Sequence, residues 1–134
     1  MVQREVAERL TAPVGSRASG AVTVKLAFYS SARVVGAVPA TVFVPRPNVE
    51  SALVEIRRHA QPPVDVEDPA RLFALVQAGF AHRRKTLRKA LAGAVPDAGG
   101  LLAAAGIESA RRAEELTLGE WAALAGAETA AGAA

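Results

Sequence analysis

The sequence contains no cysteine and only two histidines, His59 and His82, among its 134 residues. Without cysteine there is no disulfide framework, no thiolate nucleophile and no thiolate metal site. Without a third imidazole, a histidine metal cluster is also disfavoured, so we expect no metal.

Long apolar runs are absent as well. No stretch of about 18 apolar residues occurs, and charged side chains appear as early as Arg4 and Glu5. The sequence therefore predicts neither a signal peptide nor a membrane span, and we expect a cytoplasmic protein. Because there is no glycine-rich loop after a predicted strand and no Walker motif, the residues alone show no catalytic constellation.

Positive charge is concentrated in one segment, although the net charge is only +3. Within this segment the apolar residues Phe80, Leu87 and Leu91 recur at helical spacing, so one face can pack while the cations remain available to phosphates. From composition alone, a solvated helix face with salt bridges to Glu114 or Glu115 is slightly favoured over phosphate binding. The five cations are Arg83, Arg84, Lys85, Arg88 and Lys89.

The first part of the chain predicts two helices and two strands. Residues 2–11 have the pattern of an amphipathic helix, and the spacing in residues 21–29 favours a buried helix over a strand. Residues 33–38 and 51–58 predict strands joined by a proline-rich loop. In this loop Phe43 offers a stacking surface for a base, but packing into the core is the favoured interpretation from composition.

The second part of the chain predicts a small group of helices. Residues 60–68 are a linker by composition, and Asp68 followed by Pro69 is typical of a helix start. The apolar seam then runs to Leu91. The pattern also allows a break in this helix near Gly79 or near His82.

Two further helices are expected before the end of the chain. Residues 101–105 predict a short helix that Gly106 stops. Thr117 and Glu120 form a capping-box pattern for a last helix through Leu124. The Ala/Gly-rich tail at residues 126–134 is predicted to be disordered.

Five stretches, taken in order over residues 1–125, are similar to the C-terminal part of the KsgA-type rRNA adenine N6,N6-dimethyltransferases. This order also separates the chain from the erythromycin-resistance methyltransferases, which share the proline-rich loop. The stretches are residues 3–10; Ser16-Arg17 with Gly20 and residues 22–24; Phe43-x-Pro45-x-Pro47-x-Val49-x-Ser51-Ala52; Phe80-x-x-Arg83-Arg84-Lys85-Thr86-Leu87-Arg88; and Gly106-Ile107 with Arg112-Ala113-Glu114-x-Leu116-Thr117.

The resemblance implies an α+β fragment in four segments. Residues 1–59 correspond to the last two strands and flanking helices of a Rossmann-like methyltransferase domain, and residues 60–68 to a linker. Residues 69–125 correspond to a small all-helical rRNA-binding domain, and residues 126–134 to the disordered tail.

The resemblance also implies a function for the complete enzyme, which uses S-adenosylmethionine to dimethylate two adjacent adenines of small-subunit rRNA in the immature 30S subunit. Phe43 would lie beside the flipped adenine. The cations of the basic segment would contact rRNA phosphates, although Lys89 stands where the family usually has Asn. The family's cofactor loop and Asn-Leu-Pro-Tyr motif have no counterpart here. We therefore expect no catalytic or cofactor-binding residue, no bound cofactor and no activity in this chain alone.

Two alternatives belong to other functional classes. The chain is a non-enzymatic RNA-binding or ribosome-assembly module in the first, and a small basic DNA-binding helical protein in the second. The two strands and the proline-rich loop argue against the second, because a helix-turn-helix needs neither.

Overall fold

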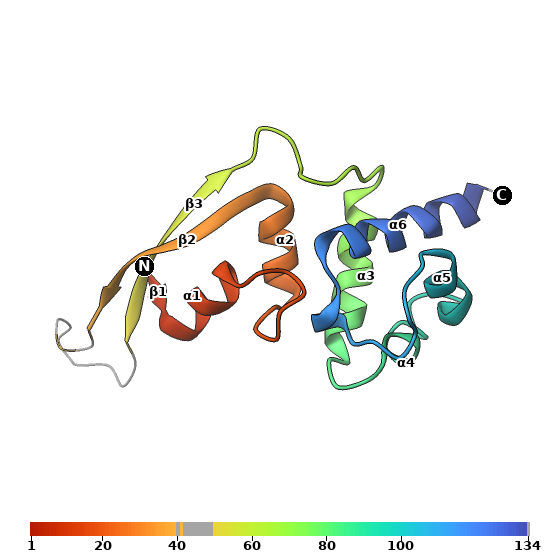
Figure 1. Ribbon diagram of the computed structural model, residues 1–134, viewed down its shortest axis with the longest axis horizontal. Helices are drawn as coiled ribbons and strands as arrows, with labels where there is room; N and C mark the ends of the chain where they lie inside the picture. The colour runs from red at the N-terminus through yellow and green to blue at the C-terminus, as the bar shows by residue number, and fades with distance from the viewer. Residues whose placement is uncertain (40, 42–49, 134) are drawn as a thin grey trace.

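The computed structural model describes residues 1–39, 41 and 50–133. Figure 1 shows a small sheet at one end, the helices of the second part at the other, and two helices between them. The first part comprises β1 (Val2–Gln3), α1 (Arg4–Thr11), α2 (Ala21–Tyr29), β2 (Ser30–Val38) and β3 (Ser51–Arg58). The second comprises α3 (Pro69–Ala81), α4 (Leu87–Ala90), α5 (Ala98–Ala104), the 3₁₀ turn η2 (Ala113–Glu115) and α6 (Leu118–Ala133).

The predicted α+β architecture is confirmed, but the sheet has three strands rather than two. Its order is β1-β3-β2, and both pairs are antiparallel. The first predicted helix begins at Arg4 because Val2 and Gln3 pair with β3. The strand predicted from residue 33 begins at Ser30, which pairs with Arg58 at the far end of β3.

Two predicted helix starts are confirmed by their capping hydrogen bonds. The Asp68 carboxylate accepts from the Arg71 amide at 3.4 Å, and Pro69 occupies the first turn of α3. At α6 the Thr117 amide donates to Glu120 Oε1 at 3.0 Å, and the Glu120 amide donates to Thr117 Oγ1 at 3.2 Å. Both caps satisfy amides that a helix leaves without an internal partner.

The ends of two other helices differ from the prediction. The helix expected at residues 101–105 starts earlier, at Ala98, because the Asp97 carboxylate caps the Gly100 amide at 3.0 Å. The last helix does not end at Leu124, and the tail predicted to be disordered is helical through Ala133. A contact between α6 and α3 holds this extension, since Glu128 forms an ion pair with Arg71.

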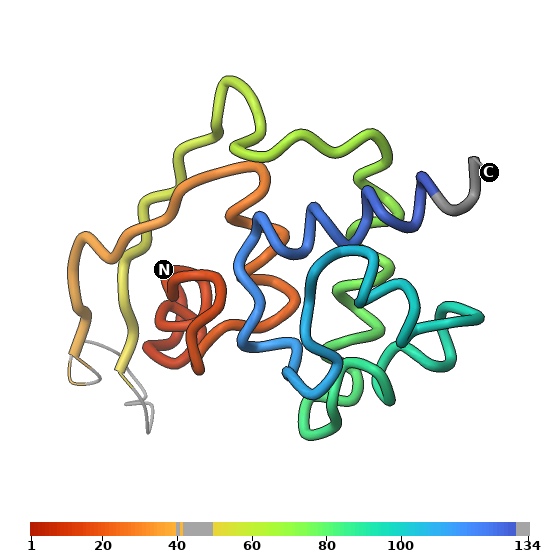
Figure 2. The backbone as a smooth tube through the Cα atoms, turned by 45° about the vertical axis from the view of Figure 1, so that its right-hand side comes forward, coloured from red at the N-terminus to blue at the C-terminus, as the bar shows by residue number. Residues whose placement is uncertain are grey.

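The two parts of the chain share one buried core. Val24 and Phe28 of α2 belong to the same cluster as Leu72 and Leu75 of α3 and Trp121 of α6. Helix α2 contacts both α3 and α6, and Figure 2 shows it between the sheet and the second part. The burial of these side chains fixes the second part against the first.

The sheet, by contrast, leaves apolar side chains in contact with water. Val34 and Val35 of β2 and Leu53 and Ile56 of β3 are each exposed by 43% or more. None of the described helices is both long and apolar enough to cross a membrane.

The Glu120 carboxylate makes the stability of the fold depend on pH. Its pKa is lowered from 4.5 to about 2, chiefly because Arg111 donates hydrogen bonds to it. Since the pKa is lower in the folded state, ionised Glu120 stabilises the fold above about pH 4.5 and loses this effect as the pH falls toward 2. We expect Glu120→Gln, which keeps the capping geometry, to lower the free energy of unfolding at pH 7 by about 1–2 kcal/mol.

Urea unfolding at a series of pH values measures this effect. The Glu120→Gln variant should show a flatter dependence of stability on pH between about 4.5 and 2 than the unaltered chain. Glu67→Gln changes an exposed carboxylate outside the capping contact and serves as the matched control. Identical pH profiles for Glu120→Gln and the unaltered chain would contradict the assignment.

Candidate nucleic-acid interface

The basic segment is not one continuous helix. Helix α3 ends at Ala81, a turn follows, and α4 begins at Leu87. The Lys85 amide donates to the His82 carbonyl at 2.9 Å within this turn. The sequence allowed a helix break near Gly79 or near His82, and in the structure α3 ends just before His82. The cations are therefore presented by a turn and a short helix instead of one long helical face.

The apolar side of this segment packs as the spacing predicts. Leu87 and Leu91 are fully buried, and the Phe80 ring lies 6.1 Å from the ring of Trp121. The Leu87 amide also donates to the Arg111 carbonyl at 2.7 Å, which ties the start of α4 to the connection before α6. The basic segment thus rests on a well-packed base.

Four of the five predicted cations form an exposed basic cluster, which consists of Arg84, Lys85, Arg88 and Lys89. The described part of the chain provides no hydrogen-bond or ion-pair partner for these four side chains. Closely spaced cations on one small surface attract polyanions without first breaking internal ion pairs. The arrangement suits contact with phosphates, and the role of each side chain stays a prediction.

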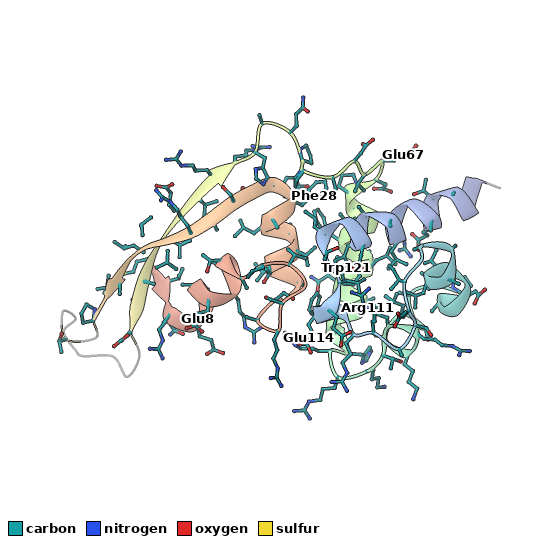
Figure 3. The ribbon with its side chains drawn as sticks, viewed as in Figure 1. Glu8, Phe28, Glu67, Arg111, Glu114 and Trp121 are labelled. Carbon is teal, nitrogen blue, oxygen red and sulfur yellow. The ribbon has the colours of Figure 1, made fainter. Side chains whose placement is uncertain are left out.

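Arg83 lies apart from this cluster. Its guanidinium forms an ion pair with Glu114 at 3.0 Å and donates to the Arg17 and Ser19 carbonyls at 2.7 and 2.8 Å. The guanidinium carbon also lies 5.7 Å from the centre of the Phe80 ring. Glu114, labelled in Figure 3, is one of the acidic partners that the non-functional interpretation of the segment anticipated, but the ion pair involves Arg83 alone among the five cations.

Two exposed arginines beside the cluster, Arg17 and Arg112, were not among the predicted RNA-binding residues. Arg17 follows Ser16 in the connection between α1 and α2, and its carbonyl accepts from Arg83. Arg112 follows Arg111, whose carbonyl accepts from the first residue of α4. Their position beside the cluster depends on contacts between residues that are far apart in the chain, from the Arg83 side chain to the Arg17 carbonyl and from the first amide of α4 to the Arg111 carbonyl.

Phe43, the predicted contact for the target base, lies outside the described residues. The strands that flank its loop are described, and Val38 and Ser51 are paired at the end of the β2–β3 ladder. The role of Phe43 stays a prediction.

Neither a metal-ligand cluster nor a glycine-rich loop after a strand occurs among the described residues. Across 1–39, 41 and 50–133, no group of three or more His, Asp or Glu side chains is placed to hold a metal ion. In these same ranges the glycines with positive φ are Gly15 and Gly106, and neither follows a strand as a nucleotide-binding loop would. The described residues therefore do not form the glycine-rich loop that S-adenosylmethionine would need.

One cavity of about 370 Å³ lies between α5 and α6. Leu101 and Ala104 contribute to its apolar lining, and its two carboxylates already have structural roles. Asp97 caps α5, and Glu128 pairs with Arg71. The cavity thus presents no free charged group with which to orient a ligand.

Comparison with known proteins gives consistent matches over nearly the whole chain. A family model described as ribosomal RNA adenine dimethylase matches residues 1–127. The ribosomal RNA small subunit methyltransferase A of Acidothermus cellulolyticus is 52% identical over 128 residues, which cover 93% of this chain and 44% of that protein. The protein of the same name from Geobacillus thermodenitrificans is 42% identical over 134 residues, which cover 95% and 46%. The chain spans about half the length of the curated relatives it matches.

Solved structures with low sequence identity share the fold. A dimethyladenosine transferase from Plasmodium falciparum matches with a TM-score of 0.71 at 18% identity, covering 91% of this chain and 53% of that one. The 23S rRNA methyltransferase ErmE matches with a TM-score of 0.62 at 23% identity, covering 93% and 51%.

Proposed function

The chain belongs to the ribosomal RNA adenine dimethylase family, and from this premise we propose that it is the rRNA-binding, C-terminal part of a small-subunit rRNA adenine dimethyltransferase. The observation that carries the proposal is the exposed basic cluster on its packed base. In this proposal residues 1–59 are the end of a Rossmann-like methyltransferase domain, and residues 69–125 are the rRNA-binding domain.

In the complete enzyme we assign RNA binding to this chain and cofactor binding to the portion that the chain does not span. S-adenosylmethionine supplies the methyl group when it is bound, and its site lies in the portion of the enzyme that this chain does not span. The exposed basic cluster holds rRNA phosphates, and Phe43 contacts the target adenine once it has left the base stack. The substrate is the immature small subunit, and the reaction takes place in the cytoplasm.

The electrostatics of the cluster favour an RNA partner. Each phosphate that Arg84, Lys85, Arg88 or Lys89 neutralises releases condensed counterions, so binding weakens as salt rises. Because these side chains are exposed and the described residues offer them no ion-pair partner, no internal contact opposes their use. Leu87 and Leu91 hold the segment in place from below.

We expect this chain alone to bind a small-subunit rRNA hairpin without methylating it. Binding is measured by fluorescence anisotropy at several salt concentrations, and methyl transfer from labelled S-adenosylmethionine to immature small subunits by incorporated radioactivity. The relative from Acidothermus cellulolyticus is the positive control for transfer. Turnover by this chain alone would contradict the proposed division, and the absence of salt-dependent RNA binding would contradict the proposed function.

A second candidate function is a non-enzymatic RNA-binding or ribosome-assembly module. It is favoured by the fact that the basic cluster and the core beneath it both lie within this one chain. Its test is whether the chain promotes small-subunit assembly when a separate enzyme supplies the methylation. Competition between an rRNA hairpin and duplex DNA separates both candidates from DNA binding.

A further inference from the structure

We propose that Arg83 is a positioning residue that clamps the exposed basic cluster to the first part of the chain and does not contact phosphate itself. The inference rests on the proposed RNA-binding function, because it assigns different roles to adjacent cations of the same segment.

The contacts of Arg83 join three segments that are far apart in the sequence. Nε and Nη2 both donate to Glu114 of η2, at 3.3 and 3.0 Å. Nη2 also donates to the Arg17 and Ser19 carbonyls, in the connection between α1 and α2. One side chain thus holds the turn after α3, the turn before α6 and a loop of the first part.

A second contact reinforces the same junction. Ser19 is almost completely buried, and its hydroxyl donates to the Glu114 carbonyl at 3.2 Å. Glu114 therefore accepts from Arg83 through its carboxylate and from Ser19 through its backbone. A planar guanidinium suits such a junction because it directs several donors in fixed directions, which a lysine ammonium cannot do.

The exposed basic cluster begins at the next residue, Arg84. Within the turn, the backbone bond from Lys85 to His82 is local and does not tie the turn to the rest of the molecule. The Leu87 amide attaches the start of α4 to the connection before α6, and the Arg83 contacts attach the turn to the first part of the chain. The Arg83 contacts therefore preorganise the exposed cations relative to the connection between α1 and α2, which lowers the cost of ordering them on RNA.

The same contacts argue against a phosphate role for Arg83. Its side chain is only 32% exposed, and that of Glu114 only 21%. Turning the guanidinium toward a phosphate would leave a partly buried carboxylate and two carbonyls without their donor. The neighbouring Arg84 and Lys85 can reach phosphate without such a loss.

Three substitutions give different RNA affinities and salt dependences for the two roles. For a clamp, Arg83→Lys, Arg83→Gln and Glu114→Gln each weaken binding of the rRNA hairpin severalfold and leave the salt dependence unchanged. For a phosphate contact, Arg83→Lys retains affinity and Arg83→Gln lowers the slope of log K against log salt by about 0.7–0.9. Glu114→Gln would then strengthen binding, because it removes a competing carboxylate. Retained affinity in Arg83→Lys, a lower salt slope in Arg83→Gln or stronger binding in Glu114→Gln would each overturn the proposal.

Arg84→Gln is the matched control, because it removes the same charge from the adjacent, exposed position. It should lower the slope by about 0.7–0.9. If neither Arg84→Gln nor Lys85→Gln changes RNA binding, the proposed function fails.

Hydrogen exchange tests the clamp without RNA. In Arg83→Lys, amide exchange should accelerate in residues 16–20 and 82–86 while the slowest amides of α3 and α6 keep their rates. A uniform acceleration would indicate a general loss of stability and would overturn the positioning role. Unchanged exchange in both segments would overturn it as well.

Discussion

Replacing Arg84, Lys85, Arg88 and Lys89 together by glutamine should weaken binding to a small-subunit rRNA hairpin by roughly a thousandfold near 0.1 M salt. Each phosphate contact contributes about 0.7–0.9 to the slope of log K against log salt, so four contacts contribute about 3. The slope should fall by that amount, and the affinities of the variant and the unaltered chain should converge at high salt. Anisotropy titrations at several salt concentrations measure both quantities.

The matched control removes four exposed cations elsewhere on the surface, Lys25 among them. It changes the net charge by the same amount as the cluster variant but leaves the cluster intact. We expect it to keep most of the salt slope. Equal losses in the two variants would show that RNA responds to total charge and not to the cluster. The control substitutions are Arg9→Gln, Lys25→Gln, Arg57→Gln and Arg58→Gln, which leave Arg33 as the partner of Glu55.

Trp121→Ala should produce the largest loss of stability, about 3–5 kcal/mol in the free energy of unfolding. Trp121 is fully buried, and its ring packs against Phe80. Its Cη2 would lie 2.9 Å from a Cβ added at Gly79, so the tryptophan fills the space that this glycine leaves. Truncation therefore opens a cavity between α3 and α6, directly behind the basic segment.

Urea unfolding followed by circular dichroism measures this loss. Val22→Ala, at a position that is 50% exposed, is the control and should change the free energy of unfolding by no more than about 0.5 kcal/mol. A loss below about 1 kcal/mol for Trp121→Ala would contradict the central position of this side chain in the core.

Local signals in the sequence were enough to place several helices. The Asp68-Pro69 start and the Thr117–Glu120 capping box depend on residues within three positions of one another, and the structure confirms both. The helix at residues 21–29 was also predicted correctly, because its apolar spacing outweighed its β-branched content.

Features that depend on distant partners were not predictable in this way. The first strand consists of two residues and exists because they pair with Ser51 and Ala52. The extension of α6 depends on a contact between Arg71 and Glu128, which lie 57 positions apart. Periodicity cannot detect such pairings, since it records only the neighbours of each residue along the chain.

The candidate site likewise combines features that the local sequence predicts with features that depend on distant contacts. The exposure of Arg84 and Lys85 follows from a dense run of charge, which the sequence displays openly. The inward direction of Arg83 follows from carbonyls 64 and 66 positions away and from a carboxylate 31 positions away. The sequence therefore identified the basic segment as a whole but could not assign different roles to its adjacent arginines.

The unequal pairing of β3 has a consequence for solubility. Strand β2 covers one edge of β3 along its length, whereas β1 covers only Ser51 and Ala52 on the other edge. Within the described ranges, no strand pairs with residues 53–58 on that second edge, and Leu53 and Ile56 beside it are exposed. Unpaired amides and carbonyls in such a row act as a template for intermolecular strand addition. We therefore expect self-association of this chain alone to proceed through its sheet, at the opposite end of the molecule from the helices that carry the cations.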